Sequence, residues 1–279
     1  MKNSNKHKIL VIGAGNMGCS IASGLLTKDW SEHQLIFCEQ LRERHKILVN
    51  TFPGSEIISD IASLKCHPDI ILLAVKPNDM SSVCLQIADC KLQPSLFISI
   101  AAGVPVKAFH RWLGNDATIV RCMPNTPAAI GAGMTGLFTP ANTSNENRDI
   151  ANEVLSAIGK TVWVEDESLI DAVTAISGSG PAYLFYFMEC MQASGENLGL
   201  SSEESYRLTL QTMLGAAQLA DGHATSFQQL RENVTSKGGT TEQAILCFNQ
   251  NNTQQIIDQA VKAAAAKASE ISQSFEEEE

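Results

Sequence analysis

From residue 8 the sequence reads Lys-Ile-Leu-Val-Ile-Gly-Ala-Gly-Asn-Met-Gly, ending at Gly18. Residues 8–12 predict a short buried strand, and a helix is expected after the glycines, to about Lys28. Gly13 would permit the tight turn, Gly15 would let backbone approach a pyrophosphate, and Gly18 would let helix and strand pack closely. The free N–H groups at the start of the helix would face that anion. This context favours a dinucleotide site over a plain glycine-rich turn.

Strands and helices alternate along the rest of the N-terminal part. The apolar run at 69–75 is typical of a strand that is buried on both faces. The sequence predicts further strands over 34–38, 95–100 and 117–122, and helices over 41–50, 79–91 and 105–112. This alternation predicts an α/β fold with a parallel, doubly wound sheet of the Rossmann type.

The pattern changes near residue 165, after which strand signals are almost absent. Helices are expected over 167–176, 181–198, 202–221, 239–250 and 253–275. Residues 209–220 are apolar nearly all round, so this helix must be covered on most sides, and a second subunit is the natural cover. We therefore expect a dinucleotide-binding Rossmann domain over 1–164 and an all-α dimerisation and substrate-binding domain over 165–279.

Composition narrows the class of partner. The net charge is −10, so the chain would repel the phosphate backbone of nucleic acid. No apolar run approaches the ~20 residues that a membrane span needs. The N-terminal lysines run straight into a strand without a cleavage site, which is not typical of a secretory signal.

Eight cysteines are scattered along the chain, and none forms a Cys-x-x-Cys pair. Several lie in apolar runs, where a free thiol behaves as a small hydrophobe. A disulfide framework is not expected at this length and spacing, which favours a reducing cytoplasm. The histidines and cysteines show no metal-ligand pattern, so no metal site is expected.

Glu39 bears on the choice of cofactor because it ends the second strand, 21 residues after Gly18. In Rossmann folds an acidic residue at this place hydrogen-bonds the adenosine ribose, which suits NADH and repels the extra phosphate of NADPH. Arg42 and Arg44 follow Glu39 closely in the sequence and could reverse this cofactor preference by binding that phosphate. Glu39 could also point to solvent and pair with one of these arginines.

A second candidate anion site precedes the helix expected from residue 239. Ser236 and Thr241 supply hydroxyls, and Gly238 and Gly239 free the backbone for a turn that can point several N–H groups at one carboxylate or phosphate. Thr240 and Gln243 have the spacing of a capping box, so a plain helix cap is the alternative. A third turn, 177–181, opens a helix with Pro181 at its first position, and it could line the same cavity or only let two helices approach.

These motifs make the chain recognisable. It resembles the pyrroline-5-carboxylate reductase family over almost its whole length. The motifs that carry the resemblance are Ile12-Gly-Ala-Gly-Asn-Met-Gly18, Ala74-Val-Lys-Pro77, Ser99-Ile-Ala-Ala-Gly103, Arg121-Cys-Met-Pro-Asn-Thr-Pro127, Asp171-Ala-Val-Thr-Ala-Ile-Ser-Gly-Ser-Gly-Pro-Ala-Tyr183 and Thr235-Ser-Lys-Gly-Gly-Thr-Thr241. The first is generic, whereas the last two are highly specific in this order and spacing.

The resemblance implies reduction of 1-pyrroline-5-carboxylate to L-proline by hydride from NADPH or NADH. It also implies an active site at a homodimer interface, and assembly of the dimers into rings in many members. The implied cofactor contacts, with Glu39 added from its place in the fold, are Gly13, Ala14, Gly15, Asn16, Met17, Gly18, Glu39, Ala74, Val75, Lys76, Pro77, Ala101, Ala102 and Asn125. The implied substrate contacts are Ser236, Gly238, Gly239, Thr240 and Thr241.

The hydroxyl of Thr241 is our candidate for contact with the ring nitrogen of the substrate. A cyclic imine is basic enough to arrive partly protonated, so no Asp/His dyad is expected. The family usually has proline where this chain has Lys237; we expect that side chain to point outward and function to remain intact. Two alternatives stay open: a related reductase that acts on another imine or carbonyl acid, and a non-catalytic dinucleotide sensor.

Overall fold

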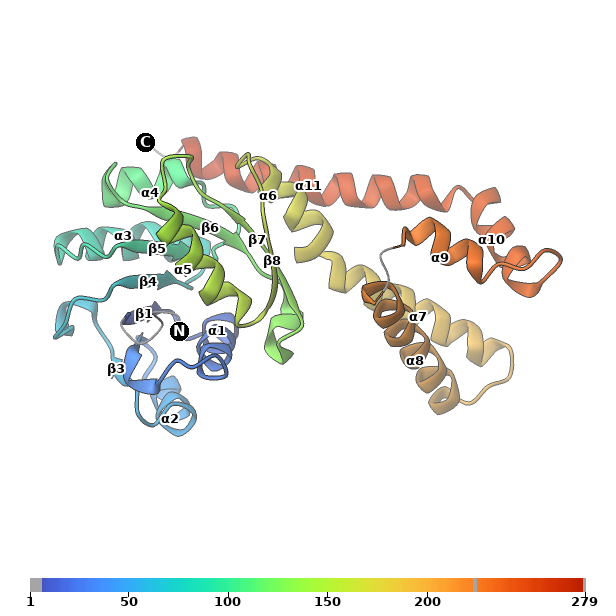
Figure 1. Cartoon of the computed structure of the whole chain (residues 1–279), viewed down its shortest axis with the longest axis horizontal. Helices are drawn as coiled ribbons and strands as arrows, with labels where there is room; N and C mark the ends of the chain where they lie inside the picture. The colour runs from blue at the N-terminus through green and yellow to red at the C-terminus, as the bar shows by residue number, and fades with distance from the viewer. Residues whose placement is uncertain (1–6, 223–224, 278–279) are drawn as a thin grey trace. The chain divides into compact units, whose positions relative to one another are not determined.

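The computed structural model describes residues 7–222 and 225–277 (Figure 1). By their internal contacts these residues form two compact units. One comprises the residues up to Ser179 together with those from Ala264 onward, and the other is Gly180–Ala263. Within the described residues, no helix is both long and apolar enough to cross a membrane.

The first unit is built on one eight-stranded sheet in the order β3-β2-β1-β4-β5-β6-β7-β8. Only β6 and β7 pair antiparallel; the other neighbours are parallel. The strands are β1 (Ile9–Ile12), β2 (Leu35–Cys38), β3 (Glu56–Ile58), β4 (Ile70–Leu73), β5 (Leu96–Ser99), β6 (Ile119–Met123), β7 (Gly133–Phe138) and β8 (Gly159–Trp163). The structure therefore confirms the predicted doubly wound sheet.

Helices cover both faces of this sheet. Because side chains alternate along a strand, Ile9 and Val11 face one core while Leu10 and Ile12 face the other. The first core is closed by α1 (Asn16–Leu26), α2 (Arg42–Thr51) and α5 (Asn145–Ser156), and the second by α3 (Met80–Asp89) and α4 (Val106–Leu113). Short 3-10 turns lie at η2 (Glu32–Gln34), η3 (Ile61–Ser63), η4 (Pro77–Asp79) and η5 (Thr126–Ile130).

The predicted strands and helices of the N-terminal part are all present, but β3, α5, β7 and β8 were not predicted. The six residues of β7 include two glycines, and β8 is only partly buried. Neither strand has the continuous apolar run that marks the central strands. The sequence pattern therefore missed one edge of the sheet.

The C-terminal end of α11 (Thr253–Glu277) belongs to the first unit, where it is held by a buried arginine. The Arg121 side chain is 4% exposed and its Nη1 lies 2.9 Å from Glu167 Oε1. Its Nη2 donates to Ser272 Oγ of α11 at 3.2 Å and lies 3.7 Å from an oxygen of Asp171. Burial raises the pKa of Asp171, and the Arg121 charge acts in the opposite direction.

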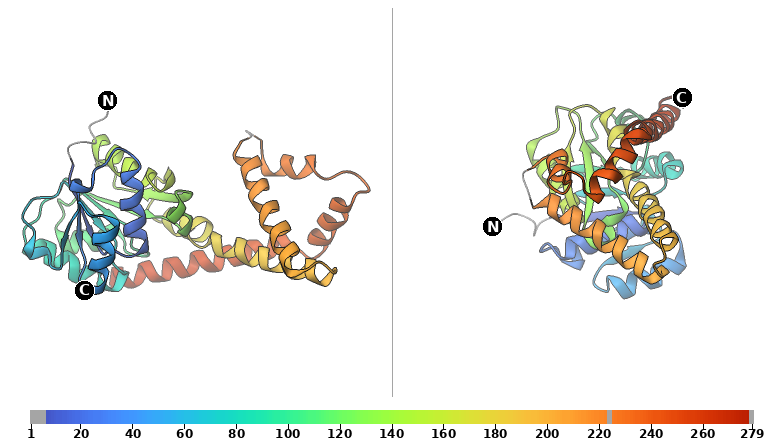
Figure 2. Two further views of the ribbon diagram at one scale, coloured as in Figure 1. Left: turned by 90° about the horizontal axis from the view of Figure 1, so that it is seen from below. Right: turned by 90° about the vertical axis from the view of Figure 1, so that its right-hand side faces the viewer.

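The second unit is helical. It holds α7 (Gly180–Asn197), α8 (Ser202–Asp221), α9 (Phe227–Asn233), α10 (Thr240–Gln250) and the first part of α11. Helices α7 and α8 pack together as a hairpin (Figure 2). Helix α9 was not predicted, whereas the other helices of this unit were. The domain boundary proposed at residues 164 and 165 differs from the division into compact units. Helix α6 (Leu169–Val173) packs on the sheet, and the residues from Ala264 onward also belong to the first unit.

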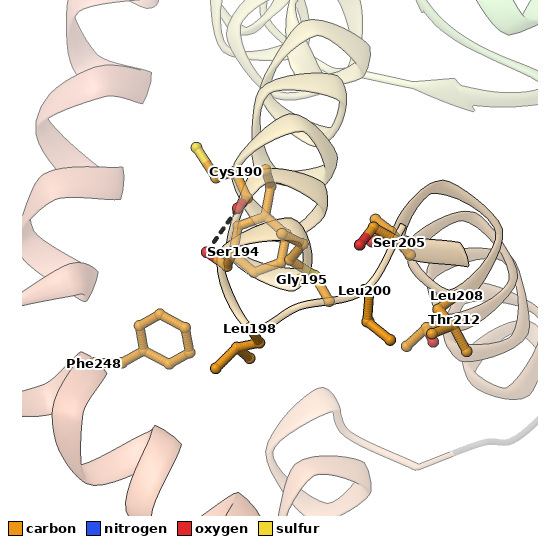
Figure 3. A pocket seen from close by; sticks show the side chains of 12 residues that line it. Cys190, Ser194, Gly195, Leu198, Leu200, Ser205, Leu208, Thr212 and Phe248 are labelled. Carbon is orange, nitrogen blue, oxygen red and sulfur yellow. Dashed lines mark hydrogen bonds between the residues drawn. The ribbon is translucent and has the colours of Figure 1, made fainter. Parts of the chain in front are cut away.

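Helix α8 leaves apolar side chains uncovered within the single chain. Leu210, Leu214 and Leu219 are each between 43% and 50% exposed. In the same unit, an apolar groove of about 400 Å³ is lined by residues of α7, α8 and the loop between them, and by Phe248 of α10 (Figure 3). This agrees with the sequence-based expectation that the helix needs a cover from outside the chain.

Candidate functional site

Apart from Glu39, which follows β2, the predicted cofactor residues follow four neighbouring strands of the sheet. Because β1, β4, β5 and β6 are parallel and adjacent, their carboxyl ends meet at one edge. The glycine turn follows β1, the segment 74–77 follows β4, the segment 101–102 follows β5, and Asn125 follows β6. Strand order reverses at β1 and β4, which is where open α/β sheets bind ligands.

The three glycines of the first turn serve three different purposes. Gly13 has φ +93°, and a Cβ there would lie 2.8 Å from the carbonyl of Ala74. A Cβ on Gly18 would lie 2.6 Å from the Gly13 oxygen. Gly15, in contrast, faces open space, so its lack of a side chain clears room beside the helix rather than avoiding a protein contact. The roles predicted for Gly13 and Gly18 are confirmed, and the approach of a pyrophosphate at Gly15 stays a prediction.

The start of α1 fits a diphosphate. Gly15 is the N-cap, no side chain caps the helix, and no acidic residue lies in its first turn. The N–H groups of Asn16, Met17 and Gly18 have no carbonyl partner within an α-helix, so they can donate to an anion. These three N–H groups are therefore suited to bind the pyrophosphate of a dinucleotide.

Glu39 points its carboxylate at the glycine turn. Its Oε2 accepts the N–H of Ala14 at 3.1 Å, and its Oε1 accepts the N–H of Leu41 at 3.0 Å. No ion pair with Arg42 or Arg44 forms within the described residues. The alternative in which Glu39 points to solvent and pairs with an arginine is therefore wrong, because two backbone amides hold its carboxylate.

A positive charge nevertheless lies near the same turn. Burial raises the pKa of the Cys19 thiol on α1, and the Arg44 guanidinium partly opposes that rise. Arg44 is half-buried and Arg42 is exposed. The end of β2 thus combines a fixed carboxylate with a nearby guanidinium.

The side chain of Asn125 is engaged by the protein itself. Its Oδ1 accepts the N–H of Met134 at 2.8 Å, and its Nδ2 donates to the carbonyl of Ser177 at 3.0 Å. In an α-helix the Ser177 carbonyl would accept the N–H of residue 181, but proline has none. Asn125 satisfies this carbonyl, and so ties the third predicted turn to the end of β6.

The third turn is helical rather than a loop, which corrects the sequence-based expectation. A π-helical segment, η6 (Thr174–Gly178), continues α6 and leads directly into α7. The N–H of Ser179 donates to the Thr174 carbonyl at 2.8 Å, the five-residue step of a π-helix. Single π turns of this kind often occur at functional sites.

The second anion turn lies wholly within the helical unit. Helix α10 begins at Thr240 with Gly239 as its N-cap, and no side chain caps it. The capping box expected for Thr240 and Gln243 is therefore wrong, because Thr240 is already the first helical residue. The Thr241 hydroxyl makes no cap either, and Lys237 is exposed, as expected.

Sequence reasoning missed one acidic residue of this turn. Gly238 has φ +74°, and its N–H donates to Glu242 Oε2 at 2.7 Å. A glutamate at the third helical position commonly reaches back to an amide that precedes the helix. The spacing of Glu242 from Gly239 was the available signal.

Together, the doubly wound sheet, its glycine turn and the free N–H groups at the start of α1 define a dinucleotide-binding protein of the oxidoreductase class. Family models agree: residues 8–103 match "NADP oxidoreductase coenzyme F420-dependent", and residues 167–271 match "Pyrroline-5-carboxylate reductase dimerisation". A pyrroline-5-carboxylate reductase of Pseudomonas aeruginosa is 41% identical over 95% of this chain and 97% of its own length. The chain belongs to the pyrroline-5-carboxylate reductase family.

Solved structures agree with this assignment. A pyrroline-5-carboxylate reductase from Coxiella burnetii has a TM-score of 0.90 at 37% identity, covering 95% of this chain and 98% of that one. The Plasmodium falciparum pyrroline carboxylate reductase, solved with NADP bound, has a TM-score of 0.82 at 29% identity, covering 96% and 98%. The dimerisation match supports self-association of this chain.

Proposed function

We propose that this protein reduces 1-pyrroline-5-carboxylate to L-proline with hydride from NADH or NADPH. The observation that carries the proposal is the pair of glycine-containing turns, each before a helix that no side chain caps, in a chain that matches a reductase of this name over 95% of its length. One turn suits the cofactor pyrophosphate, and the other suits the substrate carboxylate.

The proposed roles follow from the geometry at the edge of the sheet. The amides from Asn16 to Gly18 would hold the pyrophosphate. The segments 74–77 and 101–102, and Asn125, would line the path toward the nicotinamide. When bound, the dinucleotide supplies the hydride, and the protein supplies orientation and exclusion of water.

The proposed substrate contacts come from the second turn. The N–H groups of Thr240 and Thr241 are the first of α10 and have no helical partner, so they can bind a carboxylate. The Thr241 hydroxyl would contact the ring nitrogen, onto which charge shifts as the C=N bond is reduced. Its oxygen would accept the N–H of the protonated imine, and its O–H would donate to the nitrogen of the neutral imine. Because the imine arrives partly protonated, a strong general acid is not needed.

We also propose that the active site is completed by a second copy of the chain in a homodimer, with dimers able to assemble into rings. The uncovered apolar side chains of α8 support such an interface. In this arrangement the turn at 236–241 of one subunit would face the cofactor of its partner.

The geometry of Glu39 favours NADH over NADPH. A 2′-phosphate would have to lie beside a carboxylate that two amides hold in place. At ~4 Å, the repulsion of each unit charge is from about 1 kcal/mol in water to about 4 kcal/mol at an effective dielectric constant of 20. Arg44 would offset part of this repulsion, so we expect a preference for NADH rather than exclusion of NADPH.

A reducing cytoplasm is the location that we propose, because all eight cysteines are free. Burial raises the pKa of Cys38 to about 11 and that of Cys84 to about 12. These thiols stay protonated at neutral pH and act as small apolar side chains.

Steady-state rates with pyrroline-5-carboxylate and with other cyclic imines, each with NADH and NADPH, test the proposal. We expect the highest kcat/KM with pyrroline-5-carboxylate. A clear preference for another imine would instead favour the related-reductase alternative. Tight cofactor binding without turnover would favour the sensor.

Lys237 gives a smaller test of the same turn. We expect Lys237→Pro to leave the KM for substrate nearly unchanged, because the side chain is exposed and the Gly-Gly-Thr-Thr segment remains intact. A rise in KM of about tenfold or more would mean that the lysine helps to bind substrate.

A further inference from the structure

Glu242 places a carboxylate of the chain itself in the turn proposed to bind the substrate carboxylate. Its Oε2 accepts the N–H of Gly238 at 2.7 Å, and the side chain is half-buried. Gly238 is exposed and has open space around it. One donor of this turn is therefore already bound to an anion.

The remaining donors of the turn are divided between the protein and an incoming ligand. The N–H of Gly239 donates to the Ser236 carbonyl at 3.0 Å. No side chain caps α10, so the first helical amides, at Thr240 and Thr241, remain for a carboxylate. A substrate bound by these amides would lie within the same short turn as the Glu242 carboxylate.

The Glu242 carboxylate and a substrate carboxylate would repel each other at the start of α10. Both would also be attracted by the positive end of the same helix dipole. The helix dipole favours negative charge at this end, and Glu242 already provides that charge. Binding of substrate or of proline must then overcome repulsion from Glu242, or displace it from Gly238. A neutral side chain of the same shape would keep the hydrogen bond and remove the repulsion.

We propose that Glu242 is the resident anion of this turn, and that it weakens binding of substrate and product carboxylates. This proposal rests on the proposed function. Glu242 acts here as an affinity-determining residue: it keeps the turn folded around Gly238 and helps proline to leave after reduction.

Two substitutions separate the charge of Glu242 from its hydrogen bond. Glu242→Gln keeps an acceptor for the Gly238 N–H and removes the charge, whereas Glu242→Ala removes both. Glu146→Gln is the matched control, because Glu146 is an exposed acid in the first turn of α5 and belongs to the other compact unit. The readouts are KM and kcat for pyrroline-5-carboxylate and the Kd of proline by calorimetry, at low and at high salt.

We expect Glu242→Gln to lower both KM and the proline Kd by about threefold to tenfold. The difference between parent and variant should decrease at high salt, because salt screens the Glu242 charge. Glu242→Ala should lower them at least in part, since it also removes the charge, and Glu146→Gln should change neither. Unchanged or raised values in both Glu242 variants, with the parent active, would overturn this inference alone. A parent that neither reduces the substrate nor binds proline would instead overturn the proposed function.

Discussion

Glu39 holds a negative charge against the glycine turn, fixed by the N–H groups of Ala14 and Leu41. Its position in the sequence suggested a role in cofactor choice but left the direction of its side chain open. The structure adds that, if the carboxylate swung away, the N–H of Ala14 would lose its acceptor. Ala14 is only 1% exposed, and leaving a buried amide unpaired is costly.

Glu39→Gln should therefore shift the cofactor preference. The amide oxygen can still accept one of the two N–H groups, but the charge is lost. We expect the ratio of kcat/KM with NADH to that with NADPH to fall by about fivefold or more. Glu43→Gln, at an exposed acid in the first turn of α2, is the control. A parent enzyme that already prefers NADPH would contradict the proposed role of Glu39.

Thr241 is the residue to which we assign contact with the reacting ring. Thr241→Val removes the hydroxyl at nearly constant volume, and we expect a loss of about 10- to 10³-fold in kcat/KM, mostly in kcat. Thr241→Ser restores a hydroxyl and should recover most of the rate. Activity of the valine variant within about threefold of the parent would remove Thr241 from the mechanism.

Among the elements, α11 shows how a long helix is held at its C-terminal end. Gly103 has φ +80°, and a Cβ there would clash with Cγ2 of Ile271. Phe275 is buried in the core that α3 and α4 cover. Arg121 adds a polar tie to Ser272, so the last turns of the helix are fixed by both apolar packing and charge.

Arg121→Met should destabilise this attachment. It leaves the carboxylates of Glu167 and Asp171 without their cationic partner. Removal of one member of a buried pair costs about 3 kcal/mol of unfolding free energy, and because these acids are 27% and 17% exposed we expect a loss of up to that size. Lys262→Met is the control, because it breaks an exposed ion pair on the same helix, worth about 0.5 kcal/mol or less. Urea denaturation at one protein concentration measures both. Equal, small losses would mean that Arg121 does not anchor α11.

At the scale of the whole molecule, the helical unit carries more apolar surface than a single chain covers. Besides the leucines of α8, Phe185 and Tyr186 of α7 are 64% and 67% exposed. Apolar surface of this kind is typical of an interface between subunits. Self-association would therefore contribute directly to the stability of the fold.

Leu214→Glu should weaken that association. Leu214 is 49% exposed on α8, and a charge placed in an apolar interface loses its hydration. We expect a shift from dimer to monomer in sedimentation velocity, with loss of activity, since the proposed site needs both subunits. Leu85→Glu, at a leucine 53% exposed on α3, should change neither. A dimer that survives Leu214→Glu at all concentrations would place the interface elsewhere.

The sequence was most informative where one local property decides the structure. Continuous apolar runs located the central strands, and the spacing of three glycines located the cofactor turn. The same reasoning failed for β7 and β8, because glycines and half-buried positions hide a strand that lies toward the edge of the sheet. It also placed a capping box at Thr240, since spacing alone cannot say which residue begins a helix.

The sequence by itself thus determined the α/β class, the glycine turn and the likeness to a reductase family, because these depend on short-range patterns. Only the tertiary structure decided which amides receive the Glu39 and Glu242 carboxylates, and that Asn125 satisfies the carbonyl that Pro181 leaves free. The order of the parallel strands likewise brings distant segments to one edge of the sheet. The physical reason is that a hydrogen bond depends on distance and direction in space, and these are set by how the whole chain packs.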